Sequence, residues 1–147
     1  VQYSILPQVR IMGSYHYYFD KDAKMADDKQ KLLGGNTMEY LGGAEWDITK
    51  NILVSVGYQH TQYNLGNGAY LNDMSFVTSN NSYGFGAKFK VMKNASVNIA
   101  YFFTDYEHKK KEYSQTITEG GQEITVQNTD DFTRTNKVFG VGLDIDL

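Results

Sequence analysis

Three histidines, His16, His60 and His108, are of the residue type that most often acts as a general base. A hydrolase would combine one of them with a nucleophile and an acidic residue. His16 lies on the polar face of an alternating segment, His60 lies near the end of another, and His108 lies in a polar connection, none with a nucleophile motif beside it. The chain also lacks cysteine, which excludes thiolate nucleophiles and thiolate metal sites. We therefore expect no catalytic residues and no enzyme.

The segment DKDAKMADD, Asp20 to Asp28, has spaced carboxylates like those of a calcium loop. It lacks the central glycine and the closing glutamate of an EF-hand, so we interpret it as a solvated charged loop. No metal and no cofactor are expected. The net charge of −3, from 14 basic and 17 acidic residues spread along the chain, argues against nucleic acid as a partner.

Period-two alternation of apolar and polar residues is the dominant pattern, and it predicts antiparallel strands. One face of each alternating segment is apolar or glycine, and all the charged residues of these segments fall on the other face. Twelve tyrosines, eight phenylalanines and a single proline agree with a chain rich in strands. Six strands are expected, over residues 9–19, 38–48, 52–58, 83–91, 95–104 and 139–147.

Such a pattern suits either a membrane barrel or a soluble barrel, and the strand lengths and connections favour the membrane. About 10 residues at roughly 3.3 Å each, when tilted, span the apolar band of an outer membrane. The connections alternate short and long: those at 4–8, 49–51 and 92–94 are short, whereas those at 20–37, 63–80 and 106–135 are long. Tight periplasmic turns and long external loops are typical of transmembrane barrels.

Aromatic side chains on the apolar face collect toward the strand ends, as expected at two lipid–water interfaces. Lys137 shares this face at a position from which its stem could reach the outer headgroups. Lys109, Lys110 and Lys111 beside Glu107 and Glu112 are interpreted as loop solvation, with contact to lipopolysaccharide phosphates as the alternative. The predicted lipid-interface aromatics are Tyr15, Tyr17, Phe19, Tyr40, Trp46, Phe89, Phe103 and Phe139.

The opposite face would line the lumen of the barrel. Some of its positions are apolar where a water-filled porin would be polar, so they could line a path for hydrophobic molecules or pack against a plug. Its charged positions have both signs and predict ion pairs across the wall or with the plug. The candidate path is Met12, Tyr18, Leu41, Leu53, Ala100, Phe102 and Val138. The predicted charge network is Arg10, Glu39, Glu45, Asp47, Lys88 and Lys90.

Val1 to Tyr3 resemble the tail of an earlier strand that enters a tight turn at Pro7. Six strands and a stub are fewer than the smallest single-chain outer-membrane barrels use. We therefore expect residues 1–147 to be one C-terminal segment of a larger barrel.

With the strands placed, the chain resembles the C-terminal part of the FadL-like outer-membrane transporters of long-chain fatty acids and aromatic hydrocarbons. The resemblance rests on YHYYFDKDA (15–23), MEYLGGAEWDITKNILVSVGYQHTQY (38–63), DMSF (73–76), NIAYFFTDYEH (98–108) and TRTNKVFGVGLDIDL (133–147). It implies a fourteen-stranded barrel, plugged by an N-terminal hatch, that passes hydrophobic molecules inward.

We therefore expect an all-β, antiparallel up-and-down transmembrane barrel in the bacterial outer membrane that transports hydrophobic small molecules passively. Its partners would be outer-membrane lipids, the ligand, and the remaining N-terminal strands and hatch of the same protein. A structural membrane barrel without transport, or a soluble ligand-binding β-barrel, is the alternative.

Overall fold

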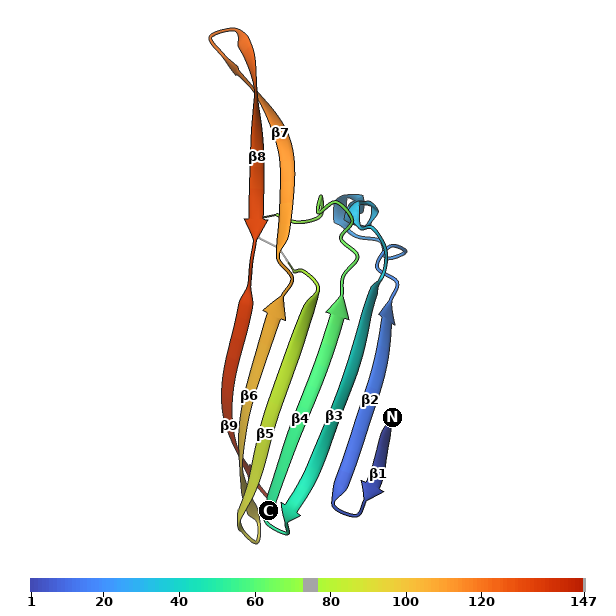
Figure 1. Ribbon diagram of the computed structural model, residues 1–147, viewed down its shortest axis with the longest axis vertical. Coiled ribbons are helices and arrows are strands. Elements are labelled where there is room, and N and C mark those ends of the chain that lie inside the picture. Colours follow the sequence, from blue (N-terminus) through green and yellow to red (C-terminus); the bar gives the residue numbers. More distant parts are fainter. Residues whose placement is uncertain (73–76, 147) are drawn as a thin grey trace.

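The protein is all-β, and its strands are antiparallel throughout (Figure 1). The computed structural model describes residues 1–72 and 77–146. The DMSF stretch 73–76 and Leu147 lie outside the described residues. Seven strands form one sheet in the order β1-β2-β3-β4-β5-β6-β9, and β7 and β8 form a separate two-stranded sheet. The strands are β1 (Gln2–Leu6), β2 (Val9–Tyr18), β3 (Thr37–Thr49), β4 (Ile52–Gln62), β5 (Asn80–Met92), β6 (Ala95–Tyr106), β7 (Lys109–Glu119), β8 (Gln122–Phe132) and β9 (Thr135–Ile145).

The six strands expected from the alternation are confirmed as β2, β3, β4, β5, β6 and β9. Each is 10 to 13 residues long. Several extend further toward the long loops than predicted, and β4 continues from Tyr58 to Gln62. The residues Gln59 to Gln62 show no apolar alternation, yet all four pair with β3, and Gln59 to Thr61 also pair with β5. Residues Gln2–Leu6, which include part of the expected stub, form the short strand β1 and pair antiparallel with β2.

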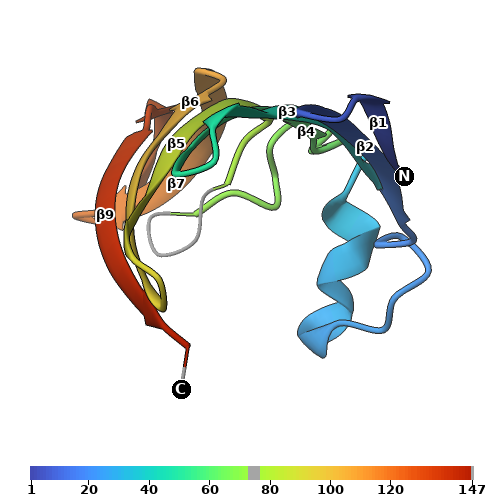
Figure 2. The same ribbon diagram turned by 90° about the horizontal axis from the view of Figure 1, so that it is seen from below.

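The sheet curves into an open arc, which Figure 2 shows from one end. The predicted short connections are confirmed at residues 7–8, 50–51 and 93–94, and all three lie at one end of the sheet, which we call the turn end. The long connections lie at the opposite end, the loop end. There the η1 3₁₀ helix (Ala26–Leu32) lies on the concave side of the arc (Figure 2).

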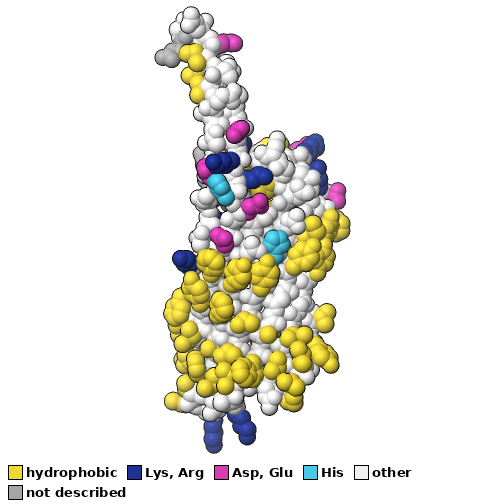
Figure 3. Space-filling model, viewed as in Figure 1, with side chains coloured by type: hydrophobic (Ala, Val, Ile, Leu, Met, Phe, Trp, Pro, Cys, Tyr) yellow, Lys and Arg dark blue, Asp and Glu magenta, His cyan; other side chains and the backbone are white. Residues whose placement is uncertain are grey.

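Hydrophobic side chains cover the convex face of the sheet, while charged side chains gather toward its two ends (Figure 3). These residues belong to the apolar set of the alternation and are strongly exposed, as at Trp46 (53%), Val56 (53%) and Phe139 (67%). Among the described residues, by contrast, only Leu65, Leu71 and Phe132 have buried hydrophobic side chains. The main sheet therefore has no apolar core between two layers of its own.

The prediction of one long loop from 106 to 135 is wrong, because most of this segment forms the β7–β8 hairpin. Gly120 and Gly121 have positive φ values of 60° and 80° and form the tight turn that joins the two strands. Threonine, isoleucine, valine and tyrosine favour the extended backbone on both sides of this turn. The hairpin projects beyond the main sheet at the loop end (Figure 1).

Candidate functional site

A hollow of about 720 Å³ lies on the concave face, near the middle of the strands. Its floor consists of small residues on neighbouring strands, namely Gly43, Gly57, Gly84, Gly86 and Ala100. A glycine has no Cβ, so these positions keep the wall thin and the hollow deep. At Gly43 the fit is tight, since a Cβ there would lie 3.1 Å from the carbonyl oxygen of Val56.

Four residues of the predicted hydrophobic path, Met12, Leu41, Ala100 and Phe102, line this hollow together. They come from β2, β3 and β6, so residues far apart in sequence meet on one concave surface. The hollow also contains polar side chains, among them Ser14, Ser55 and Gln59. It is thus an apolar trough with a few hydroxyl and amide groups at defined positions.

The other three residues of the predicted path do not line the hollow. Tyr18 lies nearer the loop end, where its hydroxyl donates to the Glu39 carboxylate at 2.9 Å. Leu53 lies at the turn end in a smaller hollow with Lys88 and Lys90. Val138 lies opposite Phe102 on the edge strand β9 and is 55% exposed.

Ion pairs line the concave face at the turn end. The Arg10 guanidinium donates to Glu45 Oε2 at 3.0 Å and to Asp47 Oδ2 at 2.6 Å. These three side chains lie on β2 and β3, which pair at Arg10 and Glu45. Further along the arc, Lys88 Nζ lies 3.0 Å from Asp144 Oδ2. Lys90 shares the smaller hollow with Asp146.

Glu39 is the centre of a second polar cluster, on the concave face toward the loop end. Its Oε2 accepts from Tyr18 and lies 3.2 Å from His16 Nδ1, while its Oε1 accepts from Gln59 and Thr61. The other nitrogen of His16, Nε2, lies 2.9 Å from Ser14 Oγ. Glu39 belongs to the predicted charge network, but most of its described hydrogen-bond partners are uncharged side chains.

Although no nucleophile motif stands beside a histidine in the sequence, Ser14 Oγ contacts the His16 imidazole. Ser14 and His16 are two residues apart and therefore share one face of β2. Glu39 lies directly opposite His16 on β3. The spacing of Ser14 and His16 could have indicated the pair, but the register that adds Glu39 is not visible in the sequence.

The two other histidines have polar partners of a different kind. His60 Nδ1 lies 2.9 Å from the amide oxygen of Asn81. His108 contacts the carboxylate of Asp131 at the base of the β7–β8 hairpin. Within residues 1–72 and 77–146, no group of three or more His, Cys, Asp or Glu side chains could hold a metal ion.

The long connections pack together into a cap at the loop end. Leu65, Leu71 and Phe132 form its buried core, and Leu33, Tyr63 and Tyr70 pack against them. Burial raises the pKa of the Tyr63 phenol above its ordinary value. The cap unites three segments that the sequence presented only as separate polar loops.

Two of the lysines expected in a solvated loop instead help to build this cap. They lie on β7, where Lys111 Nζ donates to the carbonyl of Leu71 at 2.9 Å and Lys109 Nζ to that of Gly66 at 3.4 Å. The charged segment 20–28 remains polar and exposed for most of its length, although its end forms the start of η1.

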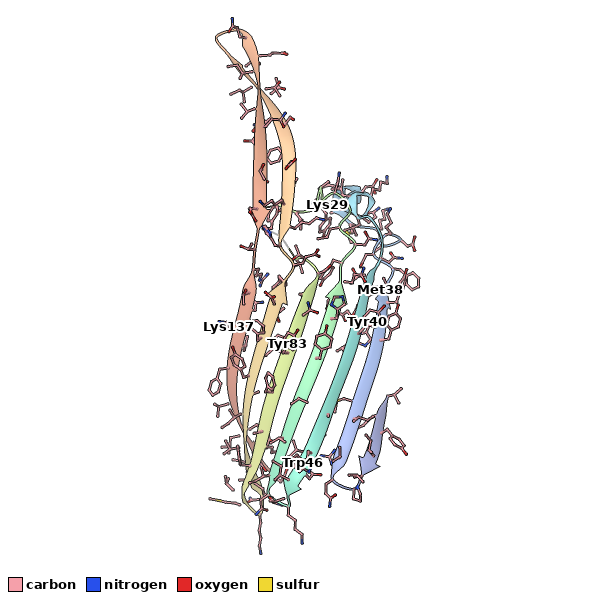
Figure 4. All side chains as sticks on the ribbon, in the orientation of Figure 1. Lys29, Met38, Tyr40, Trp46, Tyr83 and Lys137 are labelled. Atoms are coloured by element: carbon pink, nitrogen blue, oxygen red, sulfur yellow. The ribbon has the colours of Figure 1, made fainter. Side chains whose placement is uncertain are left out.

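Aromatic rings on the convex face form a row across the strands toward the loop end. Tyr15 packs on Tyr40 with ring centroids 5.1 Å apart, and Tyr83 packs on Tyr58 at 5.4 Å and on Phe103 at 6.1 Å. Figure 4 shows Tyr40 and Tyr83 at similar heights, Lys137 near that level, and Trp46 close to the turn end. Met38 lies at the loop end of β3, the strand of Tyr40 and Trp46, and below Lys29 of η1 in this view.

Three of the remaining predicted interface aromatics fall near these two levels, whereas Phe139 lies near the middle of its strand. Tyr17 and Phe19 have ring centroids 5.0 Å apart near the loop end of β2. Phe139 on β9 lies opposite Tyr101. Phe89 lies opposite Ile52. Like Trp46, it is near the turn end.

This chain matches no protein-family model, no curated protein and no solved structure. In the described part of the chain, no helix has both the length and the apolar character needed to cross a membrane.

Proposed function

We propose that the seven-stranded sheet is part of a transmembrane β-barrel in a bacterial outer membrane. The support is the direction of its apolar face. In a soluble barrel the apolar side chains would point to the inside of the curve, whereas here they cover the convex side and are exposed (Figure 3). A lipid environment is the solvent that such a face requires.

The two edge strands of the sheet support the proposal that the sheet is part of a larger barrel. In the described residues β1 and β9 each pair with one neighbour, so each leaves one row of backbone groups without a strand partner. Unpaired edges are not tolerated in lipid, and further strands of the same protein would complete the ring. We propose that the tight turns face the periplasm and the cap faces the cell exterior.

Trp46 provides a direct test of the lipid-facing surface. It is the single tryptophan of this sequence, it lies on the convex face near the turn end, and it is 53% exposed. We expect brominated phospholipids to quench its fluorescence when the full-length protein is reconstituted in vesicles. The measured quantity is the quenching lost in Trp46→Phe. Equal quenching in both proteins would contradict a lipid contact at Trp46.

We propose that the barrel passes hydrophobic small molecules, of fatty-acid-like or aromatic chemistry, by passive diffusion. The observation that carries this proposal is the apolar hollow of about 720 Å³ on the face that would line the lumen. A lumen filled with water and open to ions would favour polar side chains at Met12, Leu41 and Phe102. The N-terminal hatch implied by the family resemblance would be the partner that closes the lumen, and no cofactor is required.

Charged substitutions in the hollow test this function. We expect Leu41→Asp and Phe102→Asp to reduce uptake of a fluorescent fatty acid by vesicles containing the full-length protein, because a carboxylate in the trough disfavours apolar ligands. Ser96→Asp is the matched control, since Ser96 lies in the smaller hollow at the turn end. Unchanged uptake in both lumen variants, with normal assembly, would remove the hollow from the path.

A further inference from the structure

Ser14, His16 and Glu39 have the arrangement of a serine hydrolase triad. Ser14 Oγ lies 2.9 Å from His16 Nε2, and His16 Nδ1 lies 3.2 Å from Glu39 Oε2. The carboxylate accepts, so Nδ1 carries the proton and Nε2 is free to accept from the serine hydroxyl. Nucleophile, base and orienting acid thus lie in the order that acyl transfer requires. We propose that this site hydrolyses carboxylic esters, an activity separate from passive transport.

Several hydrogen bonds hold the Glu39 carboxylate in place, in addition to its contact with His16. Tyr18 donates to Oε2 at 2.9 Å, and Gln59 and Thr61 donate to Oε1 at 3.3 Å and 3.2 Å. Its side chain is 16% exposed, whereas that of His16 is 46% exposed. The carboxylate is therefore fixed and shielded, while the imidazole can be reached from the lumen. This is the division expected between an orienting group and a working base.

The surroundings of Ser14 indicate the substrate class. Ser14 lies on the wall of the hollow, together with Leu41, Met12 and Phe102. An ester whose carbonyl carbon approaches Ser14 Oγ can therefore place an apolar acyl chain in the trough. Esters of medium or long acyl chains fit this surface better than acetyl esters, because a longer chain buries more apolar area.

The chemistry is a two-step acyl transfer with water as the second reactant. Ser14 Oγ attacks the ester carbonyl carbon while its proton moves to His16 Nε2. The C–O bond to the alcohol then breaks, and the imidazolium gives its proton to the departing alcohol. In the second step water loses a proton to His16 Nε2 and attacks the acyl-serine carbonyl carbon. The C–O bond to Ser14 Oγ then breaks, His16 returns the proton to Oγ, and the carboxylic acid leaves.

The setting of Ser14 within a paired strand limits the rate. Its backbone is opposite Leu41 in the β2–β3 ladder, whereas many hydrolases place the nucleophile on a turn whose free N–H groups bind the oxyanion. Losing one oxyanion donor slows such enzymes by about 10² to 10³. We therefore expect slow turnover of activated esters, and no cleavage of peptide bonds.

A fluorophosphonate probe tests the nucleophile without relying on turnover. Ser14 Oγ would displace fluoride from phosphorus and remain covalently labelled, which peptide mass spectrometry locates. On the full-length protein in detergent, we expect labelling at Ser14 and slow hydrolysis of p-nitrophenyl octanoate, faster than of the acetate. Ser14→Ala should lose both, and His16→Ala should lose most of both.

Ser96→Ala is the matched control, because Ser96 lies in the smaller hollow at the turn end, outside the proposed site, and contacts no histidine in the described hydrogen bonds. It should keep full labelling and hydrolysis. Retained fatty-acid uptake by Ser14→Ala would show that the variant is assembled, and it separates this activity from transport. Hydrolysis by Ser14→Ala at the unmodified rate, or labelling at Ser14 no stronger than at Ser96, would overturn the proposal.

Discussion

Replacing Gly57 and Gly84 together by phenylalanine should reduce uptake of hydrophobic molecules to the rate of protein-free vesicles. These glycines pair with each other on β4 and β5, and both line the floor of the concave hollow. A Cβ at Gly57 would lie 3.9 Å from the Gly42 carbonyl oxygen, and one at Gly84 would lie 3.9 Å from a Phe102 ring carbon. Two rings can therefore enter the trough without displacing backbone, and they would occupy the space left for a ligand.

The matched control is Gly13→Phe with Gly42→Phe, a paired couple on β2 and β3 whose Cβ positions point to the convex face. A Cβ at Gly42 would meet nothing within 4 Å, and one at Gly13 would lie 3.7 Å from the nearest atom. Phenylalanine on this face would contact lipid and favours strands, so assembly and uptake should be unchanged. If both double variants transport equally well, ligand does not pass through the hollow.

Val56→Arg should impair insertion far more than Ser55→Arg. The two residues are neighbours in the middle of β4 and lie on opposite faces: Val56 on the convex face, 53% exposed, and Ser55 in the hollow. Arginine on the lipid face near the bilayer midplane costs about 2–4 kcal/mol, whereas a lumen position leaves its charge in water.

Reversible urea unfolding of the full-length protein in vesicles measures this difference. We expect the free energy of unfolding to fall in Val56→Arg and to stay near that of the unmodified protein in Ser55→Arg. A larger fall in the free energy of unfolding for Ser55→Arg than for Val56→Arg would mean that the concave face is the apolar, buried face, as in a soluble barrel.

The main sheet could be predicted from the sequence because period two is a local property. Each of the six alternating segments needs only its own residues to define its two faces, and the short turns at 7–8, 50–51 and 93–94 fix the neighbours β1–β2, β3–β4 and β5–β6. The strand ends near Gln62 and Asn80 do not follow from this alternation. Polar residues occupy both faces there, and pairing with neighbouring strands, not alternation, holds them extended.

Features that depend on register or on loop packing could not be predicted in this way. Glu39 meets His16 only because β2 and β3 pair at this position, and a shift of one residue would separate them. The same holds for Arg10 and Glu45. The cap brings Leu65 and Leu71 against Phe132 across three connections, which no single segment reveals.

The β7–β8 hairpin also bears on how the sheet assembles. Tight turns join β1 to β2, β3 to β4 and β5 to β6, whereas residues 107–134 separate β6 from β9. The entropic cost of closing a flexible loop grows with the logarithm of its length. Because β7 and β8 pair with each other, the start of β7 and the end of β8 lie side by side before β9 joins the sheet. The hairpin thus shortens the effective distance along the chain, and the last strand can join the sheet almost as if it followed an ordinary turn.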